Sequence, residues 1–437
     1  MTEPFHVTSR RVFAIAGPAM LANLTTPFLG IVATAVIGRL GEPALLGGVA
    51  IASVIFDCMF WLFGFLRMGT VAFAAQAVGA KDHTEVQAVL IRAVLIATAV
   101  GIFLIILQAP LSTLMLGLMG GSDAVTRAAR LYFSIRLWSA PFVLANYVVL
   151  GWLVGQARTG IALALQIVIN VVNMAMTTWL VLGLDWGITG AAVAAIIAEA
   201  IGLIAGAVVI WRLLGGRIAV SRHALFDRAK LLHMLAINRD IMIRTAALIG
   251  AFLFFTAQGA RAGDDVLAAN AVLNNFILIG SFFLDGLANA AEQLCGSSLG
   301  ARDRKNFSQA VRLVVRWGFA FGATVTIAFA LGGASLIDVM TTSPQVRTVA
   351  RDFMWFAALA PVCGVMAYSY DGIYIGATWA RDMRNLMLAS FIIYLCSWAL
   401  LLPFGNAGLW IALLTFFLAR GLLQAWRYPA LVQTTFA

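Results

Sequence analysis

The chain has 437 residues, of which 62% are hydrophobic and only 11% are charged, and its net charge is +10. No soluble protein of this length has an interior large enough for so much apolar surface, so soluble enzymes and disordered chains are excluded. A transmembrane helix takes about 20 residues, so the composition predicts an all-α membrane protein with about a dozen spans.

Apolar windows separated by charged or Gly/Pro breaks predict twelve spans. Arg10 and Arg11 precede the first long apolar run without a cleavage site, so we expect an uncleaved first span rather than a signal peptide. The expected spans are 12–37, 45–78, 87–108, 124–155, 160–182, 188–213, 237–261, 265–299, 308–332, 345–378, 384–402 and 408–430.

The basic residues predict the orientation of these spans. If the N-terminus is inside, 21 of the 29 Lys and Arg residues fall on inner connectors and flanks, among them Arg244 and Arg420, and 7 fall outside, among them Arg136. Arg67 is then the one base within a span. We therefore expect a cell-membrane protein, in a bacterium an inner-membrane protein, with both termini cytoplasmic and no nucleic-acid partner.

An internal repeat divides the chain into two halves. The tract Gly-Ala-Lys-Asp at 79–82 recurs as Gly-Ala-Arg-Asp at 300–303, an offset of 221 residues, and Gly151 recurs at the same offset as Gly372. Because six spans is an even number, this is a parallel repeat with a binding region expected between the halves. We expect an N-lobe at 1–213, a cytoplasmic connector at 214–236 and a C-lobe at 237–437.

Charged residues within the spans mark candidate ion or substrate sites, because each costs about 2.5–3.5 kcal/mol at the bilayer centre. One base, Arg67, accompanies five acids, and an ion pair with one of them is expected. The acids are Asp57, Glu199, Asp285, Glu292 and Asp371. Asp57 and Glu199 could instead lie near wetted helix ends without a function.

The spacing favours a site in the C-terminal half. Ser281, Asp285, Asn289 and Glu292 follow one helical face, and Asp371 lies on a second face. We expect cation coupling at Asp285, Asp371 and Glu292, with Asp57 as a further candidate, and substrate contacts at Tyr368, Tyr374, Asn274 and Asn289. The alternative is a hydrogen-bonded network between helices that transports nothing.

The N-terminal half has polar but uncharged faces. Pro27 removes a backbone hydrogen bond and can kink the first span, so it is a candidate conformational residue. The candidate substrate contacts of this half are Asn23, Arg67, Asn170, Asn173 and Thr177. Small and hydroxyl residues at such spacing also serve as ordinary helix-packing contacts, and this alternative stays open.

The chain resembles the multidrug and toxic compound extrusion (MATE) family, in particular its DinF-like branch. The resemblance covers nearly the whole length and rests on several tracts, which are Thr-Ala-Val-Ile-Gly at 34–38, Phe-Leu-Arg-Met-Gly-Thr at 65–70, Asn-Arg-Asp-Ile-Met-Ile-Arg at 238–244, Leu-Asp-Gly at 284–286, the 300–303 repeat tract and Asp-Gly-Ile-Tyr-Ile-Gly-Ala-Thr at 371–378. It implies two six-helix lobes, export of amphipathic and often cationic compounds, and alternating access driven by proton or sodium entry.

The sequence departs from the family pattern in the N-terminal half. The resemblance implies an acid before the Thr-Ala of the first span and another four residues after Asn173, where this chain has Ala33 and Thr177; an accompanying threonine corresponds to Ala195. Of that cluster only Asn173 matches. An N-lobe proton cycle therefore cannot be carried over to this chain, and coupling has moved to the C-lobe acids, has passed to Asp57 or Glu199, or is lost.

These observations lead to a hypothesis and two alternatives. The hypothesis is a secondary antiporter, not an enzyme, in which a proton or sodium ion competes with a cationic substrate for a C-lobe carboxylate. The absence of a Walker A tract argues against ATP as the power source, and we expect no cofactor and no bound metal. The partners expected are small amphipathic cations and membrane lipids, with the chain acting as a monomer. The alternatives are a flippase for lipid-linked or lipid-like substrates and a membrane sensor that transports nothing.

Overall fold

The computed structural model describes residues 6–217 and 220–437, and every regular element in those ranges is a helix. Twelve helices or helix pairs in the described ranges are long and apolar enough to cross a membrane, which confirms the number of spans predicted from the sequence. The first five residues of the expected N-lobe and residues 218–219 of the expected connector lie outside the described residues.

The chain divides into two compact units. Unit 1 comprises Met1–Met20, Gly79–Lys81 and Leu235–Ala437, and unit 2 comprises Leu21–Val78 and Asp82–Met234. Helix α1 (Ser9–Gly38) therefore contributes its first part to unit 1 and the rest to unit 2.

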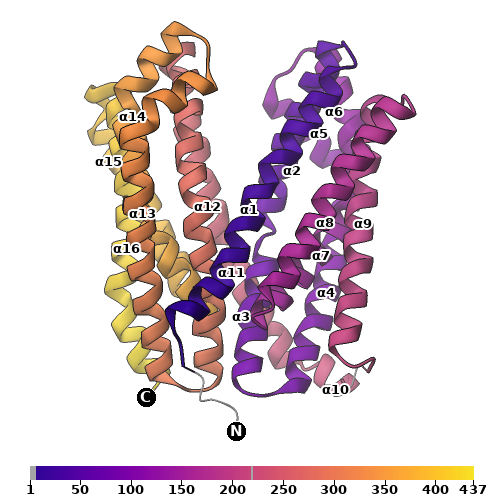
Figure 1. The fold of residues 1–437 in the computed structure, drawn as a ribbon, viewed down its shortest axis with the longest axis vertical. Coiled ribbons are helices and arrows are strands. Elements are labelled where there is room, and N and C mark those ends of the chain that lie inside the picture. The colour runs from indigo at the N-terminus through magenta and orange to yellow at the C-terminus, as the bar shows by residue number, and fades with distance from the viewer. Residues whose placement is uncertain (1–5, 218–219) are drawn as a thin grey trace. The chain divides into compact units, whose positions relative to one another are not determined.

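The helices of unit 2 follow α1 in chain order (Figure 1). They are α2 (Pro43–Leu62), α3 (Phe65–Gly79), α4 (His83–Ile106), α5 (Gln108–Met119), α6 (Asp123–Arg136), the 3₁₀ turn η1 (Leu137–Ser139), α7 (Ala140–Gly155), α8 (Thr159–Thr178), the π-helical turn η2 (Trp179–Gly183), α9 (Gly187–Leu213) and the short α10 (Arg222–Leu225). Helix α11 (Arg228–Arg261) begins in unit 2 and continues into unit 1.

The remaining helices of unit 1 are longer and less interrupted. They are α12 (Asp264–Gly300), α13 (Arg304–Met340), α14 (Pro344–Gly376), α15 (Ala380–Leu400), the 3₁₀ turn η3 (Leu402–Phe404) and α16 (Gly405–Thr435). Unit 1 keeps Pro361 inside the continuous α14, whereas in unit 2 the matching span breaks at η1 and Pro141 stands at the start of α7. Proline is tolerated in a first helical turn because its missing N–H would have no partner there.

The repeat seen in the sequence is a repeat of helix contacts. In unit 2, a Cβ added at Gly151 would meet the backbone of Arg67, and in unit 1 a Cβ added at Gly372 would meet the backbone of Ala288. Both the glycines and their partners are 221 residues apart, so Arg67 and Ala288 occupy equivalent positions, as the sequence predicts. Glycine permits this close approach because it has no Cβ.

The connectors repeat the same backbone geometry. Lys81 and Arg302 both adopt positive φ, at 58° and 53°. Each is followed by an aspartate that caps a helix: Asp82 accepts a hydrogen bond from the backbone N–H of Glu85, and Asp303 accepts one from that of Asn306, both at 2.9 Å. Such caps satisfy N–H groups that have no partner within the helix. The two six-helix halves are therefore structural repeats.

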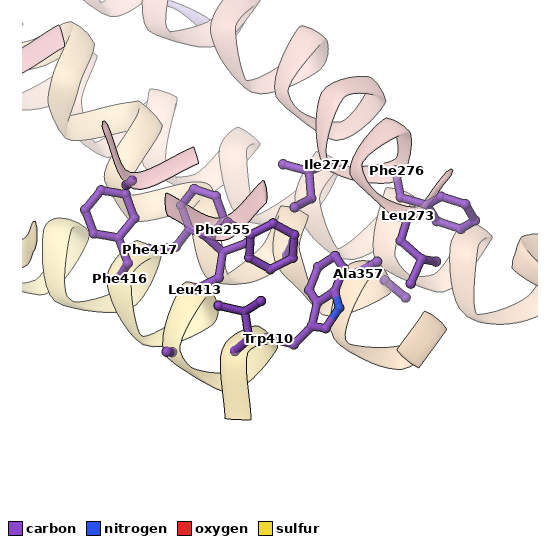
Figure 2. Close-up of a cluster of buried hydrophobic side chains, with 14 of the residues drawn as sticks. Phe255, Leu273, Phe276, Ile277, Ala357, Trp410, Leu413, Phe416 and Phe417 are labelled. Carbon is purple, nitrogen blue, oxygen red and sulfur yellow. The ribbon is translucent and has the colours of Figure 1, made fainter. Parts of the chain in front are cut away.

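Unit 1 has an aromatic core between α11, α12, α14 and α16. Figure 2 shows Phe255, Phe276, Trp410 and Phe417 among the side chains of this cluster. Phe255 and Trp410 meet edge to face with ring centroids 4.9 Å apart, an arrangement that aromatic pairs prefer. This packing joins α11 to α16.

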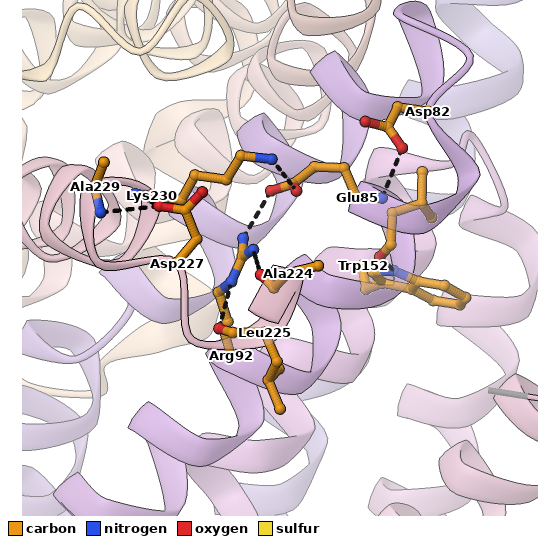
Figure 3. Close-up of polar contacts among 10 residues, drawn as sticks. Asp82, Glu85, Arg92, Trp152, Ala224, Leu225, Asp227, Ala229 and Lys230 are labelled. Carbon is orange, nitrogen blue, oxygen red and sulfur yellow. Dashed lines mark hydrogen bonds and ion pairs between the residues drawn. The ribbon is translucent and has the colours of Figure 1, made fainter. Parts of the chain in front are cut away.

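In unit 2 a buried arginine fastens the connector to α4 (Figure 3). Arg92 is 2% exposed and donates hydrogen bonds to the backbone carbonyls of Ala224 and Leu225, at the end of α10. Its Nη1 also donates to Oε1 of Glu85 at 2.7 Å, and Lys230 donates to Oε2 of the same carboxylate at 2.6 Å. The Arg92 guanidinium therefore satisfies the carbonyls at the end of α10, which have no hydrogen-bond partner within that helix.

Candidate functional site

Unit 1 contains a buried carboxylate that lies between two arginines. Asp371 of α14 forms ion pairs with Arg244 of α11 and Arg420 of α16, and it accepts a hydrogen bond from Arg420. Gln424, one turn after Arg420, donates from Nε2 to Asp371 at 2.9 Å. All four residues are buried, and Arg420 is only 1% exposed. Three helices therefore meet through one carboxylate.

The two arginines correct the assignment made from the sequence. Arg244 and Arg420 were expected on inner flanks, with Arg67 as the one base within a span, but both lie in the interior of unit 1. The reason is helix length: α11 begins at Arg228 and α16 runs from Gly405 to Thr435, so each arginine stands near the middle of its helix. An arginine that far from a helix end cannot extend its side chain to the membrane–water interface, so it needs a buried partner.

The arginine pair has more donors than Asp371 can use. Among the described residues, Nε and Nη1 of Arg420, Nε of Arg244 and Oε1 of Gln424 are buried without a hydrogen-bond partner. A buried donor or acceptor left unsatisfied costs about 1–3 kcal/mol. The Arg420 guanidinium lies 5.4 Å from the ring centroid of Tyr368, within the range of a cation–π contact.

Two further acids belong to the electrostatic surroundings of the pair. Asp285 and Glu292 of α12 both interact electrostatically with Arg244. Glu292 is 2% exposed, whereas Asp285 is half-buried. We name these five residues, Asp285, Glu292, Asp371, Arg244 and Arg420, the unit 1 charge cluster. With three carboxylates against two guanidinium groups, the cluster carries one negative charge in excess when all five groups are ionised.

The other candidates of unit 1 fall into two groups. Tyr374 is fully buried and donates its phenol hydrogen to the backbone carbonyl of Gln424 at 2.8 Å, which places it beside the cluster. Asn289 is 8% exposed and lies one turn from Asp285 on α12. Asn274 is exposed and about three turns earlier on α12, away from the acids.

The polar candidates of unit 2 form a separate network along α8. Asn170 is buried and donates to the Thr25 hydroxyl of α1 at 2.9 Å. Thr177, also buried, donates to Asn173 at 3.4 Å. Asn23 is half-buried and Pro27 is exposed, both on α1. The network joins two helices by neutral groups.

Unit 2 also contains a group of charged residues, in which the numbers of acids and bases are equal. Tyr147 interacts electrostatically with Asp57, Glu199, Arg67 and Arg136, which come from four different helices. Asp57 is exposed, while Glu199 is half-buried and accepts a hydrogen bond from Asn146 at 2.7 Å. Two acids stand against two bases, so this group has no excess charge. Arg136, expected in an outer connector, takes part in it.

Comparison with known proteins identifies the family. The family model MatE matches residues 18–179 and 241–397. DNA damage-inducible protein F of Escherichia coli (strain K12) is 37% identical over 424 residues, which are 96% of this chain and 92% of that protein. Probable multidrug resistance protein NorM of Rhizobium meliloti (strain 1021) is 26% identical, over 95% of this chain and 90% of that protein.

Solved structures agree with the fold. A transporter of the MOP superfamily from Pyrococcus furiosus, described as having a binding pocket of reverse polarity, superposes with a TM-score of 0.88 at 15% identity, covering 98% of this chain and 97% of that chain. The family match spans both six-helix halves, and the E. coli relative covers nearly the whole chain. This chain therefore belongs to the MatE family, in its DinF-like branch, and is a multi-pass membrane transporter rather than an enzyme.

Proposed function

We propose that this chain exports amphipathic organic cations by antiport against protons or sodium ions, with alternating access to a site in unit 1. The printed name of the R. meliloti relative, a probable multidrug resistance protein, supports the substrate class. The names of relatives leave the coupling residue open. The charge balance of unit 1 supports a specific assignment.

The observation that carries the proposal is the excess carboxylate of the unit 1 charge cluster. Asp371 already forms ion pairs with two arginines and accepts a hydrogen bond from Gln424, so its carboxylate already has partners. Asp285 is the half-buried acid of the cluster and so the one that a guest can reach. One proton, one sodium ion or one monovalent organic cation cancels the excess charge, so these ions compete for the cluster. Binding of the coupling ion therefore lowers the affinity for the substrate cation, and coupling requires such a difference in affinity.

The driving force is adequate for export. One charge crossing 100 mV supplies about 2.3 kcal/mol, and a gradient of one pH unit adds about 1.4 kcal/mol. Because a tenfold concentration ratio corresponds to about 1.4 kcal/mol, one proton can sustain a substrate gradient of several hundredfold.

The test is efflux of ethidium from proteoliposomes with proton and sodium gradients imposed separately. Asp285→Asn is expected to abolish the acceleration by the coupling ion, because it removes the charge for which the guests compete. Asp265→Asn, at an exposed acid in the first turn of the same helix, is the matched control and is expected to behave as the parent chain. Ion-driven efflux that persists in Asp285→Asn would refute the assignment.

A flippase for lipid-linked or lipid-like substrates is the second candidate, and the arginine pair favours it. The sequence places one base, Arg67, within a span against five acids, but Arg244 and Arg420 are also buried in unit 1, and guanidinium groups bind phosphate. Movement of a fluorescent phospholipid between leaflets of the same proteoliposomes, measured by dithionite quenching, separates the two functions. A chain that moves lipid but not ethidium is a flippase.

The orientation is proposed on the basic-residue bias. Both termini are expected in the cytoplasm of a bacterial cell, with the chain in the inner membrane. A reporter that fluoresces only in the cytoplasm, fused after Ala437, is expected to be bright, and a periplasmic alkaline phosphatase fused at the same place is expected to be inactive. The opposite pattern would reverse the orientation.

A further inference from the structure

We propose that Arg244 and Arg420 form a binding site for the anionic head group of an amphiphile, a carboxylate, sulfonate or phosphate, and that Asp371 occupies this site as an internal substitute for that group. The proposal does not rest on export of cations, because it concerns binding at equilibrium without any gradient. It adds anionic and zwitterionic amphiphiles to the expected substrates.

The first support is the number of donors. Two guanidinium groups present ten N–H donors in planar arrays that fit carboxylate, sulfonate and phosphate oxygens. Asp371 offers two oxygens, and Gln424 donates to one of them. Three nitrogens of the pair, Nε and Nη1 of Arg420 and Nε of Arg244, stay buried without a hydrogen-bond partner among the described residues. The two guanidinium groups therefore offer more hydrogen-bond donors than the Asp371 carboxylate accepts.

The second support is the chemistry of the surroundings. Gln424 is fully buried, and its Oε1 has no hydrogen-bond partner in the described part of the chain, so the site also has an acceptor for a protonated or hydroxylated head group. Tyr368, half-buried and in contact with Arg420, supplies an aromatic face for an apolar tail. Aromatic residues and arginine are both enriched in the buried parts of binding interfaces.

The third support is that Asp371 and the arginines come from different helices. It belongs to α14, whereas the arginines come from α11 and α16, so the ion pairs break if α14 moves relative to them. Breaking a buried pair exposes uncompensated charge, and this cost falls if another anion takes the vacated place. The freed Asp371 carboxylate then joins Asp285 and Glu292 as an acceptor for cations. Anion binding and cation uptake are thereby linked in one cluster.

The experiment uses the full chain in lipid nanodiscs and two probes with the same tail, octanesulfonate and octyltrimethylammonium, titrated by calorimetry. Inorganic sulfate tests whether the head group alone suffices. The parent chain is expected to bind octanesulfonate. Arg420→Gln is expected to weaken this binding about tenfold or more, as loss of one charged hydrogen-bonding partner does. Asp265→Asn is the control for charge change on the surface.

The deciding variant is Asp371→Asn. Because it removes the competing internal anion, it is expected to tighten octanesulfonate binding about tenfold, whereas loss of a purely structural ion pair does not strengthen binding. If this variant fails to fold, Arg420→Lys takes its place: it keeps the charge but loses the planar donor array, and weaker octanesulfonate binding is expected. Unchanged or weaker binding in folded Asp371→Asn, or unchanged binding in Arg420→Lys, would overturn the proposal.

Discussion

Trp410 of α16 donates its indole N–H to Oδ1 of Asn270 on α12 at 2.9 Å. The same oxygen accepts from Asn406, and Asn270 donates back to Asn406 at 2.8 Å. Figure 2 shows Trp410 within the aromatic core of unit 1. This small polar network therefore fixes the register of α16 against α12 beside the aromatic core, where the buried Asn270 and Trp410 cannot exchange a lost bond for one to water.

Asn270→Ala is expected to lower the free energy of unfolding by about 2–3 kcal/mol, because it leaves the Trp410 and Asn406 groups without partners. Asn274→Ala, one turn along α12 at an exposed amide, is the control and is expected to change stability by less than about 0.5 kcal/mol. Thermal unfolding in detergent measures both. Equal effects of the two substitutions would contradict the structural role of Asn270.

A substitution at a repeat glycine tests the close helix contact of unit 1. Gly372→Ala is expected to destabilise the protein by about 1–3 kcal/mol, because the added methyl group meets the backbone of Ala288, which cannot move aside like a side chain. Gly332→Ala, in α13 with no atom near an added Cβ, is expected to raise stability by up to about 1 kcal/mol through helix propensity. Melting temperatures that move in the same direction would contradict this account.

The connector of unit 2 depends on Arg92. Arg92→Met is expected to cost about 1.5–3 kcal/mol of local stability, because the carbonyls of Ala224 and Leu225 lose their charged donor. Limited trypsin digestion at the exposed Arg217 and Arg222 reports this as faster cleavage.

Lys230→Met is the control for the same network. Lys230 is half-exposed and pairs with Glu85 near the surface, so its loss is expected to change cleavage little. If Arg92→Met were cleaved no faster than Lys230→Met, the buried arginine would not be what holds the connector.

Asp303 makes acid stability depend on a helix cap. The backbone N–H of Asn306 donates to its carboxylate and holds the pKa of Asp303 below its ordinary value. Because the pKa of Asp303 is lowered in the folded state, the cap stabilises the protein fully at pH values above the ordinary aspartate pKa of about 3.9. This contribution is lost as the pH falls through the lowered pKa of the folded state. Asp303→Ala is expected to cost about 1 kcal/mol at neutral pH.

The measurement is the melting temperature of the parent chain and of Asp303→Ala from pH 7 down to pH 3. The difference in melting temperature between the parent chain and Asp303→Ala is expected to be constant near neutral pH and to shrink in the acid range. Protonation of Asp303 weakens the helix cap of the parent chain, and the substituted chain has already lost that cap. A difference that grows on acidification would show that another group dominates at this position.

The sequence by itself determined the membrane class, the twelve spans and the internal repeat. These properties depend on local quantities: apolar run length, helix caps such as Asp82 and Asp303, and the glycines that recur 221 residues apart. Each is set by a few neighbouring residues, so it can be recognised without coordinates. The equivalence of Arg67 in one half and Ala288 in the other follows from the same offset.

Only the tertiary structure decided which charges meet. Arg244 and Arg420 were placed at helix ends because span limits read from hydropathy are uncertain by several residues and basic residues are commonest at the interface. The pairing with Asp371 depends on the rotation of α11 and α16 about their axes, which is a property of the packed unit and not of either segment alone. Arg420 and Arg244 stand 49 and 127 positions from Asp371, and contacts over such separations leave no signal in either local segment, so the ion pairs of Asp371 became visible only in three dimensions.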